Sequence, residues 1–280
     1  MTSLPAYDIL MNRKREDTMI SKKHIDAGKP FDWGRTSENY AKYRDIYPEI
    51  FYQKIVDKGL CTAGQNILDI GTGTGVLPRN MYRYGGNWTG TDISENQIHY
   101  ARQLAAKDNM NISFMTMPAE HLDFSENTFD VVTACQCFWY FDHEILMPQL
   151  SRIVKPGGRL LILYMAWLPF EDAIARASEE LVLTYNPGWT GAKETRKSIW
   201  IPDIVSDYFT LEDHEEYDVM VPFTRETWHG RMRACRGVEA SLNAQEISKW
   251  DAEHRELLEH TTPEHFEVLH YAALAVLSKK

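Results

Sequence analysis

The stretch LDIGTGTG, from Leu68 to Gly75, places three glycines directly after a short apolar run that contains an aspartate. Glycines allow unusual φ angles and a close approach of the backbone to a ligand. A helix that follows such a loop presents its amide-rich N-terminus to the same ligand. The pattern is typical of a loop that binds a nucleotide-like molecule. The loop comprises Asp69, Gly71, Thr72, Gly73 and Gly75.

Two common phosphate-binding loops do not fit this spacing. The dinucleotide fingerprint G-x-G-x-x-G requires its third glycine where this chain has Val76. The P-loop requires a Gly-Lys-Ser/Thr sequence, and none follows here. Asp69 beside the loop would repel a pyrophosphate, whereas it suits a cationic group of the ligand.

A second acid follows at the position expected for ribose recognition. Asp92 closes the next apolar run, 21 residues after Gly71. In a doubly wound sheet, an acid at this distance hydrogen-bonds the hydroxyls of a ribose. The two acids together favour an adenosine that has no phosphates and carries an ammonium group. S-adenosylmethionine fits this description, and S-adenosylhomocysteine would be its product.

Short apolar runs alternate with helical patterns five times between Gln65 and Trp167. This alternation predicts an α/β fold with a doubly wound, mostly parallel sheet of seven strands, covered by helices on both faces. A helix over 94–109 should begin with Ser94 as its N-cap, and one over 143–155 should tolerate Pro148. The strands are predicted at 66–70, 87–93, 111–117, 127–141, 159–167, 214–223 and 268–277.

The order of the predicted strands and helices divides the chain into four parts. We expect an N-terminal helical segment over 1–60 that closes over the cofactor, and a cofactor-binding core over 61–167. A helical cap over 168–215 would be inserted after the fifth strand. Residues 216–280 would supply the strands and helix that complete the sheet.

The order and spacing of several motifs resemble those of the class I S-adenosylmethionine-dependent methyltransferases. These motifs are LDIGTGTG, TDIS, MPAEHLDFSENTFDVV and RIVKPGGRLLI, within residues 65–165. CQCFWYFD and FDWGRTSENYAKYRDIYP are similar to the small-molecule branch of type 11 methyltransferases that includes trans-aconitate methyltransferase-like proteins. That branch often has His-Trp-Phe-Asp where this chain has Trp139-Tyr140-Phe141-Asp142, so the resemblance transfers no particular substrate or base.

The resemblance implies a Rossmann-like methyltransferase fold and a role for individual residues. Asp92 would bind the ribose hydroxyls and Ile93 would pack on the adenine, although Ile93 also suits a core position. Glu120 would meet the adenine edge or simply cap a helix. Tyr40 and Arg44 would reach over the cofactor or only attach the N-terminal helix to the sheet. The implied cofactor contacts are Tyr40, Arg44, Asp69, Gly71, Thr72, Gly73, Gly75, Asp92, Ile93, Gln97, Ala119, Glu120 and Gln136.

The catalytic and substrate residues are less defined than the cofactor residues. Methyl transfer needs a general base only when the nucleophile is protonated. His143 and His229 are candidates, but a structural role explains each of them better, and the catalytic residue stays unknown. An aromatic-rich lid favours a partly apolar small molecule, although its rings would also pack against one another. The predicted substrate contacts are Trp139, Tyr140 and Trp228.

Two further groups of side chains are candidates for the site. Arg231, Arg233 and Arg236 would suit a carboxylate substrate, but their spacing favours a solvated helix. Cys135 and Cys137 should point to opposite faces of the fourth strand, and both should be buried and unreactive.

Composition sets the remaining limits. The 280 residues carry a formal net charge of −10, which argues against binding of nucleic acid. No apolar stretch is long enough to span a membrane. The four cysteines match no zinc pattern, so we expect no metal and a cytoplasmic protein, monomeric or homodimeric. Alternative functions are a binding protein for S-adenosylmethionine or S-adenosylhomocysteine without turnover, or a nicotinamide-dependent oxidoreductase.

Overall fold

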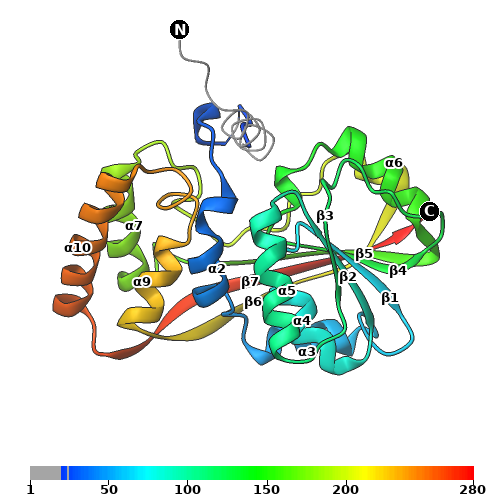
Figure 1. Ribbon diagram of the computed structural model, residues 1–280, viewed down its shortest axis with the longest axis horizontal. Coiled ribbons are helices and arrows are strands. Elements are labelled where there is room, and N and C mark those ends of the chain that lie inside the picture. The colour runs from blue at the N-terminus through cyan, green and yellow to red at the C-terminus, as the bar shows by residue number, and fades with distance from the viewer. Residues whose placement is uncertain (1–19, 24) are drawn as a thin grey trace, which may run out of the picture.

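A seven-stranded sheet forms the centre of the computed structural model, which describes residues 20–23 and 25–280 (Figure 1). The strand order is β3-β2-β1-β4-β5-β7-β6. The first five strands are parallel, and β7 is antiparallel to both of its neighbours. The predicted mostly parallel, doubly wound sheet is therefore confirmed. The strands are β1 (Asn66–Ile70), β2 (Asn87–Asp92), β3 (Ser113–Thr116), β4 (Phe129–Cys135), β5 (Val154–Trp167), β6 (Phe209–Thr224) and β7 (His265–Lys279).

Helices cover both faces of this sheet because successive strand residues point in opposite directions. Ile67 belongs to the cluster on the α3 and α4 face, whereas Leu68 belongs to the cluster with α6. Ser94 caps α5 as predicted, and α6 contains Pro148. The helices are α2 (Ser37–Tyr43), α3 (Glu49–Asp57), α4 (Val76–Met81), α5 (Glu95–Lys107), α6 (His143–Ile153), α7 (Ala173–Tyr185), α8 (Val205–Tyr208), α9 (Arg225–Arg233) and α10 (Ala244–Thr261).

Several element bounds differ from the prediction. Strand β4 ends at Cys135 rather than at Phe141, because Gln136 has a φ of +68° and 138–140 form a 3-10 turn. Strand β6 begins at Phe209, so the predicted boundary at 215/216 falls inside it. Residues 210–214 are exposed and mostly polar or charged, so no apolar alternation indicated a strand there, and pairing with β7 extends them. The part of the predicted N-terminal segment before Ile20 lies outside the described residues.

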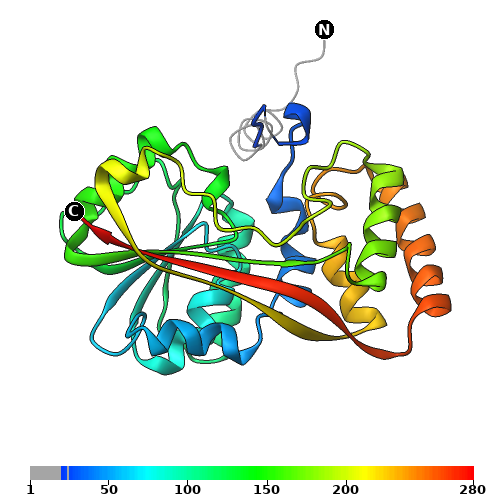
Figure 2. The same ribbon diagram turned by 180° about the vertical axis from the view of Figure 1, so that it is seen from behind.

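Three helices, α7, α9 and α10, gather at the far end of the long β6–β7 ribbon (Figures 1 and 2). We call them the helical lobe. Helix α2 runs between this lobe and the helices of the sheet, and it packs tightly on α9. A side chain at Gly230 would place its Cβ 2.3 Å from the ring of Tyr43, so only glycine permits this contact. None of the helices in the described ranges is both long and apolar enough to cross a membrane.

Candidate functional site

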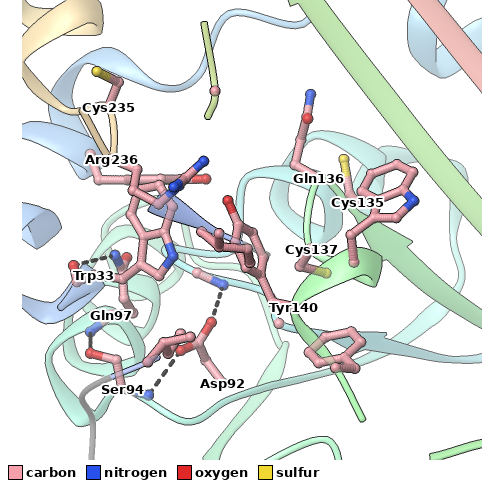
Figure 3. A pocket seen from close by; sticks show the side chains of 18 of the residues that line it. Trp33, Asp92, Ser94, Gln97, Cys135, Gln136, Cys137, Tyr140, Cys235 and Arg236 are labelled. Carbon is pink, nitrogen blue, oxygen red and sulfur yellow. Dashed lines mark hydrogen bonds between the residues drawn. The ribbon is translucent and has the colours of Figure 1, made fainter. Parts of the chain in front are cut away.

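A cavity of about 540 Å³ opens where the carboxyl ends of the parallel strands meet the N-terminal segment and the helical lobe (Figure 3). Ligands of doubly wound sheets bind at this edge. Loops that follow β1, β2, β3 and β4 all contribute to its wall. Of the residues predicted from the sequence, the following line it: Tyr40, Arg44, Gly71, Gly73, Asp92, Ile93, Gln97, Ala119, Glu120, Gln136, Trp139 and Tyr140.

Asp92 holds the loops after β1 and β2 together at the cavity wall. Its Oδ2 accepts a hydrogen bond from the backbone N–H of Gly73 at 2.9 Å. Its Oδ1 accepts one from the N–H of Ser94, also at 2.9 Å (Figure 3). Burial raises the pKa of Asp92, and these two donors oppose that rise because they stabilise the carboxylate. The carboxylate is thus held rigidly at the surface of the cavity.

Asp69 lies behind the glycine loop and does not line the cavity, which differs from the expected ligand contact. Its two oxygens accept hydrogen bonds from the hydroxyls of Thr72 and Thr133, both at 2.6 Å. Burial raises the pKa of Asp69 to about 7, against the effect of these two hydroxyls. Asp69 therefore supports the loop from within the sheet.

Two other predicted loop residues also face the protein interior. Thr72 is buried and its hydroxyl is engaged by Asp69. Gly75 begins α4 with a φ of +74°, and a Cβ there would lie 2.6 Å from the ring of Phe114. They shape the loop, while Gly71 and Gly73 form its exposed surface.

The chain turns sharply after β4 and brings two thiols to the same cavity. Gln136 has a φ of +68°, a conformation that non-glycine residues rarely adopt, and its side-chain amide donates to the carbonyl of Met165 at 2.6 Å. Because the strand alternation stops there, Cys135 and Cys137 both line the cavity, contrary to the expectation of opposite faces. Burial raises the pKa of Cys135 to about 12, and it raises that of Cys137 as well, so both thiols are neutral.

The N-terminal segment supplies the wall opposite the glycine loop. The guanidinium of Arg44 lies over the ring of Tyr40, 4.7 Å from its centroid. Trp33 packs edge-on against Tyr40, and its carbonyl accepts a hydrogen bond from the side-chain amide of Gln97 at 3.1 Å. Because Gln97 belongs to α5, this hydrogen bond attaches the N-terminal wall to that helix.

The loops after β2 and β3 form an apolar shelf with one acid. Ile93 lines the cavity although its side chain is 39% exposed, and Ala119 beside it is buried. Glu120 accepts a hydrogen bond from the backbone N–H of Asp142 at 2.9 Å. The shelf therefore offers a flat ligand an apolar face with an acid at its edge.

The two histidines predicted as candidate bases lie outside the lining of the cavity. The Nε2 of His143 is 3.0 Å from the carbonyl of Phe138. His229 is buried in the helical lobe, 3.0 Å from His254 and 3.2 Å from Asp251. Among the described residues, no histidine lines the cavity. Neither candidate is placed to remove a proton from a ligand there.

Trp228 is a core residue of the helical lobe, and the predicted substrate contact is wrong in this arrangement. It is fully buried, and its indole N–H donates to the hydroxyl of Ser178 at 2.9 Å. Its ring packs against Phe223 and Trp167. Trp167, rather than Trp228, lines the cavity.

Two arginines that sequence reasoning assigned to a solvated helix are buried in the cavity wall. Arg231 and Arg236 are 5% and 7% exposed. Arg231 follows Trp228 by three residues in α9, and this shared-face spacing with an apolar residue was a usable signal. Arg236 lies beyond the end of α9 at Arg233, so helical spacing did not apply to it.

The comparisons with known proteins agree with this geometry. Residues 68–162 match the family model described as "Methyltransferase domain". The chain is 33% identical over 110 residues to a ubiquinone biosynthesis O-methyltransferase of Aeromonas salmonicida. The aligned segment covers 39% of this chain and 46% of that protein. It is 28% identical over 108 residues to the protein of the same name from Coxiella burnetii, with 38% and 46% covered. The chain thus spans about half the length of these curated relatives.

A solved structure of similar fold extends the comparison beyond that segment. The YcgJ protein of Bacillus subtilis superposes with a TM-score of 0.53 and 19% identity, over 83% of this chain and 99% of that one. At this identity the similarity concerns the fold. The matched family model ends at residue 162, before the helical lobe begins.

Proposed function

We propose that the chain is a class I S-adenosylmethionine-dependent methyltransferase, that its cavity binds S-adenosylmethionine and that it methylates a small-molecule acceptor; the match of residues 68–162 to a methyltransferase domain supports this proposal. The observation that carries this proposal is the placement of Asp92. Its carboxylate bridges the glycine loop and the next loop at the cavity wall, and it suits the two hydroxyls of a ribose.

Three further features of the cavity fit the proposed donor. Each carboxylate oxygen of Asp92 accepts one hydrogen bond from the protein backbone. Since a carboxylate oxygen can accept more than one, Asp92 can also accept bonds from the ribose hydroxyls. Ile93 presents an exposed apolar surface next to Asp92, where an adenine would pack. Arg44 has no carboxylate partner in the described part of the chain, and it would bind the carboxylate of the methionine portion.

The residues of this chain would act mainly by positioning. Bound S-adenosylmethionine supplies a methyl group made electrophilic by its positively charged sulfur. Holding two reactants in line can lower a barrier by ~7–11 kcal/mol, so covalent help from the protein is not required. Trp33 of the N-terminal segment and Tyr140 of the turn after β4 both line the cavity and pack edge-on against each other, and this wall would exclude water. We assign no general base.

The two alternative functions differ in their support. A nicotinamide-binding sheet has six parallel strands in the order 3-2-1-4-5-6, whereas here the antiparallel β7 lies between β5 and β6. The nicotinamide alternative is therefore disfavoured. Binding without turnover uses the same cofactor residues, and only a transfer assay separates it from catalysis.

Calorimetry with three ligands tests the proposed cofactor. We expect S-adenosylmethionine and S-adenosylhomocysteine to bind and NAD to give no response. Tight NAD binding with no response to the other two would overturn the proposal. A screen of metabolites with a methyl-labelled donor then tests turnover, and transfer to a small molecule is the expected outcome.

Replacing Gly73 with alanine should weaken cofactor binding at least tenfold while the protein stays folded. Gly73 has a φ of +56°, and an added Cβ would point toward the cavity wall, with the ring of Tyr40 3.6 Å away. The left-handed backbone costs about 1–2 kcal/mol for any L-residue. Titration calorimetry with S-adenosylhomocysteine measures the change in affinity.

Gly157→Ala is the matched control for this substitution. Gly157 has a φ of +77° in the turn that begins β5, and a Cβ there would meet nothing within 4 Å. The Gly157→Ala variant carries the same backbone cost far from the cavity. It should therefore bind S-adenosylhomocysteine with the same affinity as the unaltered protein. An equal loss of affinity in both variants would show that the Gly73 effect reflects general destabilisation.

A further inference from the structure

Arg231 is a buried cation that lines the cavity without an acidic partner. It is 5% exposed, and its Nε and Nη1 atoms have no hydrogen-bond partner among the described residues. Its guanidinium lies 4.8 Å from the ring centroid of Trp167. Burial, together with the positive charge of Arg44, lowers the pKa of Arg231 to about 9, so the group is still a cation at neutral pH. A buried charge without a partner is costly, and proteins rarely keep one without use.

Of the other charged groups of the cavity wall, Arg236 and the three acids have partners, whereas Lys22 and Arg44 form no ion pair among the described residues. Arg236 forms an ion pair with Asp26. Glu194 accepts a hydrogen bond from the hydroxyl of Tyr164 at 2.7 Å and pairs with Lys197 at 2.7 Å. As described above, Asp92 and Glu120 are held by backbone N–H groups. None of these acids forms an ion pair with Arg231 in the described part of the chain.

Two guanidinium groups, those of Arg44 and Arg231, therefore face the cavity without a carboxylate. The proposed donor brings only one carboxylate, which Arg44 would bind, and its sulfonium and ammonium groups add positive charge. A second anion is needed to balance Arg231. The acceptor is the remaining molecule that the cavity must hold, and it would bring that anion.

We propose that Arg231 binds an anionic oxygen group of the methyl acceptor and so selects small anionic molecules. The inference rests on the proposed function, since it assumes that Arg44 binds the carboxylate of the donor and that the acceptor binds next to it, at Arg231. Trp167 and Trp189 line the cavity on the side of the helical lobe, so the body of the acceptor would be apolar or aromatic. A guanidinium stacked on an indole and free to form two parallel bonds is well suited to a carboxylate or a phosphate.

Binding of simple probes to the protein loaded with S-adenosylhomocysteine tests the proposal. Benzoate and phenyl phosphate carry the anion, and benzamide is the neutral counterpart of benzoate with nearly the same shape. We expect one of the two anions to bind at least tenfold more tightly than benzamide. The stronger of the two identifies the anion as a carboxylate or a phosphate. Equal binding of all three probes would overturn the proposal.

Variants at Arg231 separate its role from that of the cofactor site. In Arg231→Gln the preference for the anion should disappear, while the affinity for S-adenosylhomocysteine changes less than threefold. Arg231→Lys should keep part of the preference. If Arg231→Gln retains the full preference, the proposal is wrong. Failure of S-adenosylhomocysteine to bind the unaltered protein would instead contradict the proposed function.

Arg233→Gln is the matched control on the same helix. Arg233 pairs with Asp251 and Glu239 and does not line the cavity, so its loss should leave probe binding unchanged. The thermal midpoints supply a second readout. The thermal midpoint of Arg231→Gln should equal or exceed that of the unaltered protein, because the substitution removes an uncompensated buried charge. The thermal midpoint of Arg233→Gln should be lower than that of the unaltered protein. A purely structural role for Arg231 would make its removal the more damaging of the two.

Discussion

Replacement of Asp92 by alanine should abolish measurable binding of S-adenosylmethionine and S-adenosylhomocysteine. Hydrogen bonds to a charged group contribute about 1.5–3 kcal/mol each, so two bonds to a ribose correspond to a loss of about 100-fold or more. The substitution also removes the acceptor for the N–H groups of Gly73 and Ser94, and the glycine loop loses its attachment to β2. Titration calorimetry with S-adenosylhomocysteine measures the effect.

Two variants show whether this loss is specific to the carboxylate. Asp92→Asn keeps the size of the side chain but loses the charge and places an amide donor against a backbone N–H, so it should also bind weakly. Asp123→Ala removes an exposed acid from the loop between β3 and β4, and it should bind normally. Unchanged affinity in Asp92→Ala would mean that the ribose lies elsewhere.

Trp228→Ala should destabilise the protein by about 3–5 kcal/mol, the usual range for loss of a large aromatic side chain from a core. Trp228 is fully buried, its ring centroid lies 4.9 Å from that of Phe223, and its N–H bonds Ser178. Because domains are stable by only about 5–15 kcal/mol, this change removes a large part of the free energy of unfolding. Denaturant unfolding monitored by tryptophan fluorescence and circular dichroism measures it.

Trp200→Ala is the corresponding exposed change. Its side chain is 62% exposed, so its removal should alter the free energy of unfolding by less than about 0.5 kcal/mol. If Trp228→Ala kept normal stability and lost only acceptor binding, the predicted substrate contact would be restored and the core assignment would be wrong.

The sequence by itself determined the sheet, the glycine loop and most of the side of the cavity where we propose that the cofactor binds. These features depend on local patterns. Apolar runs such as 66–70 are too short for helices, and glycines at Gly71 and Gly73 follow directly. Ser94 caps its helix through a bond to the N–H of a residue three positions later. The chain order of a doubly wound sheet then brings Asp92 beside the loop, because neighbouring parallel strands end at the same edge.

Only the tertiary structure decided the side of the cavity where we propose that the acceptor binds. The left-handed Gln136 ends the alternation of β4, and this brings both Cys135 and Cys137 to the cavity. Trp228 lies in a core whose partners come from α7 and β6, distant in sequence. Arg231 reads as a solvated residue because arginines in helices are usually exposed. Its burial depends on α2, which packs on α9, and on Trp167 of β5, and both are distant from it in sequence. Such long-range packing leaves no periodic signal, since it is set by which surfaces meet and not by the spacing of neighbours along the chain.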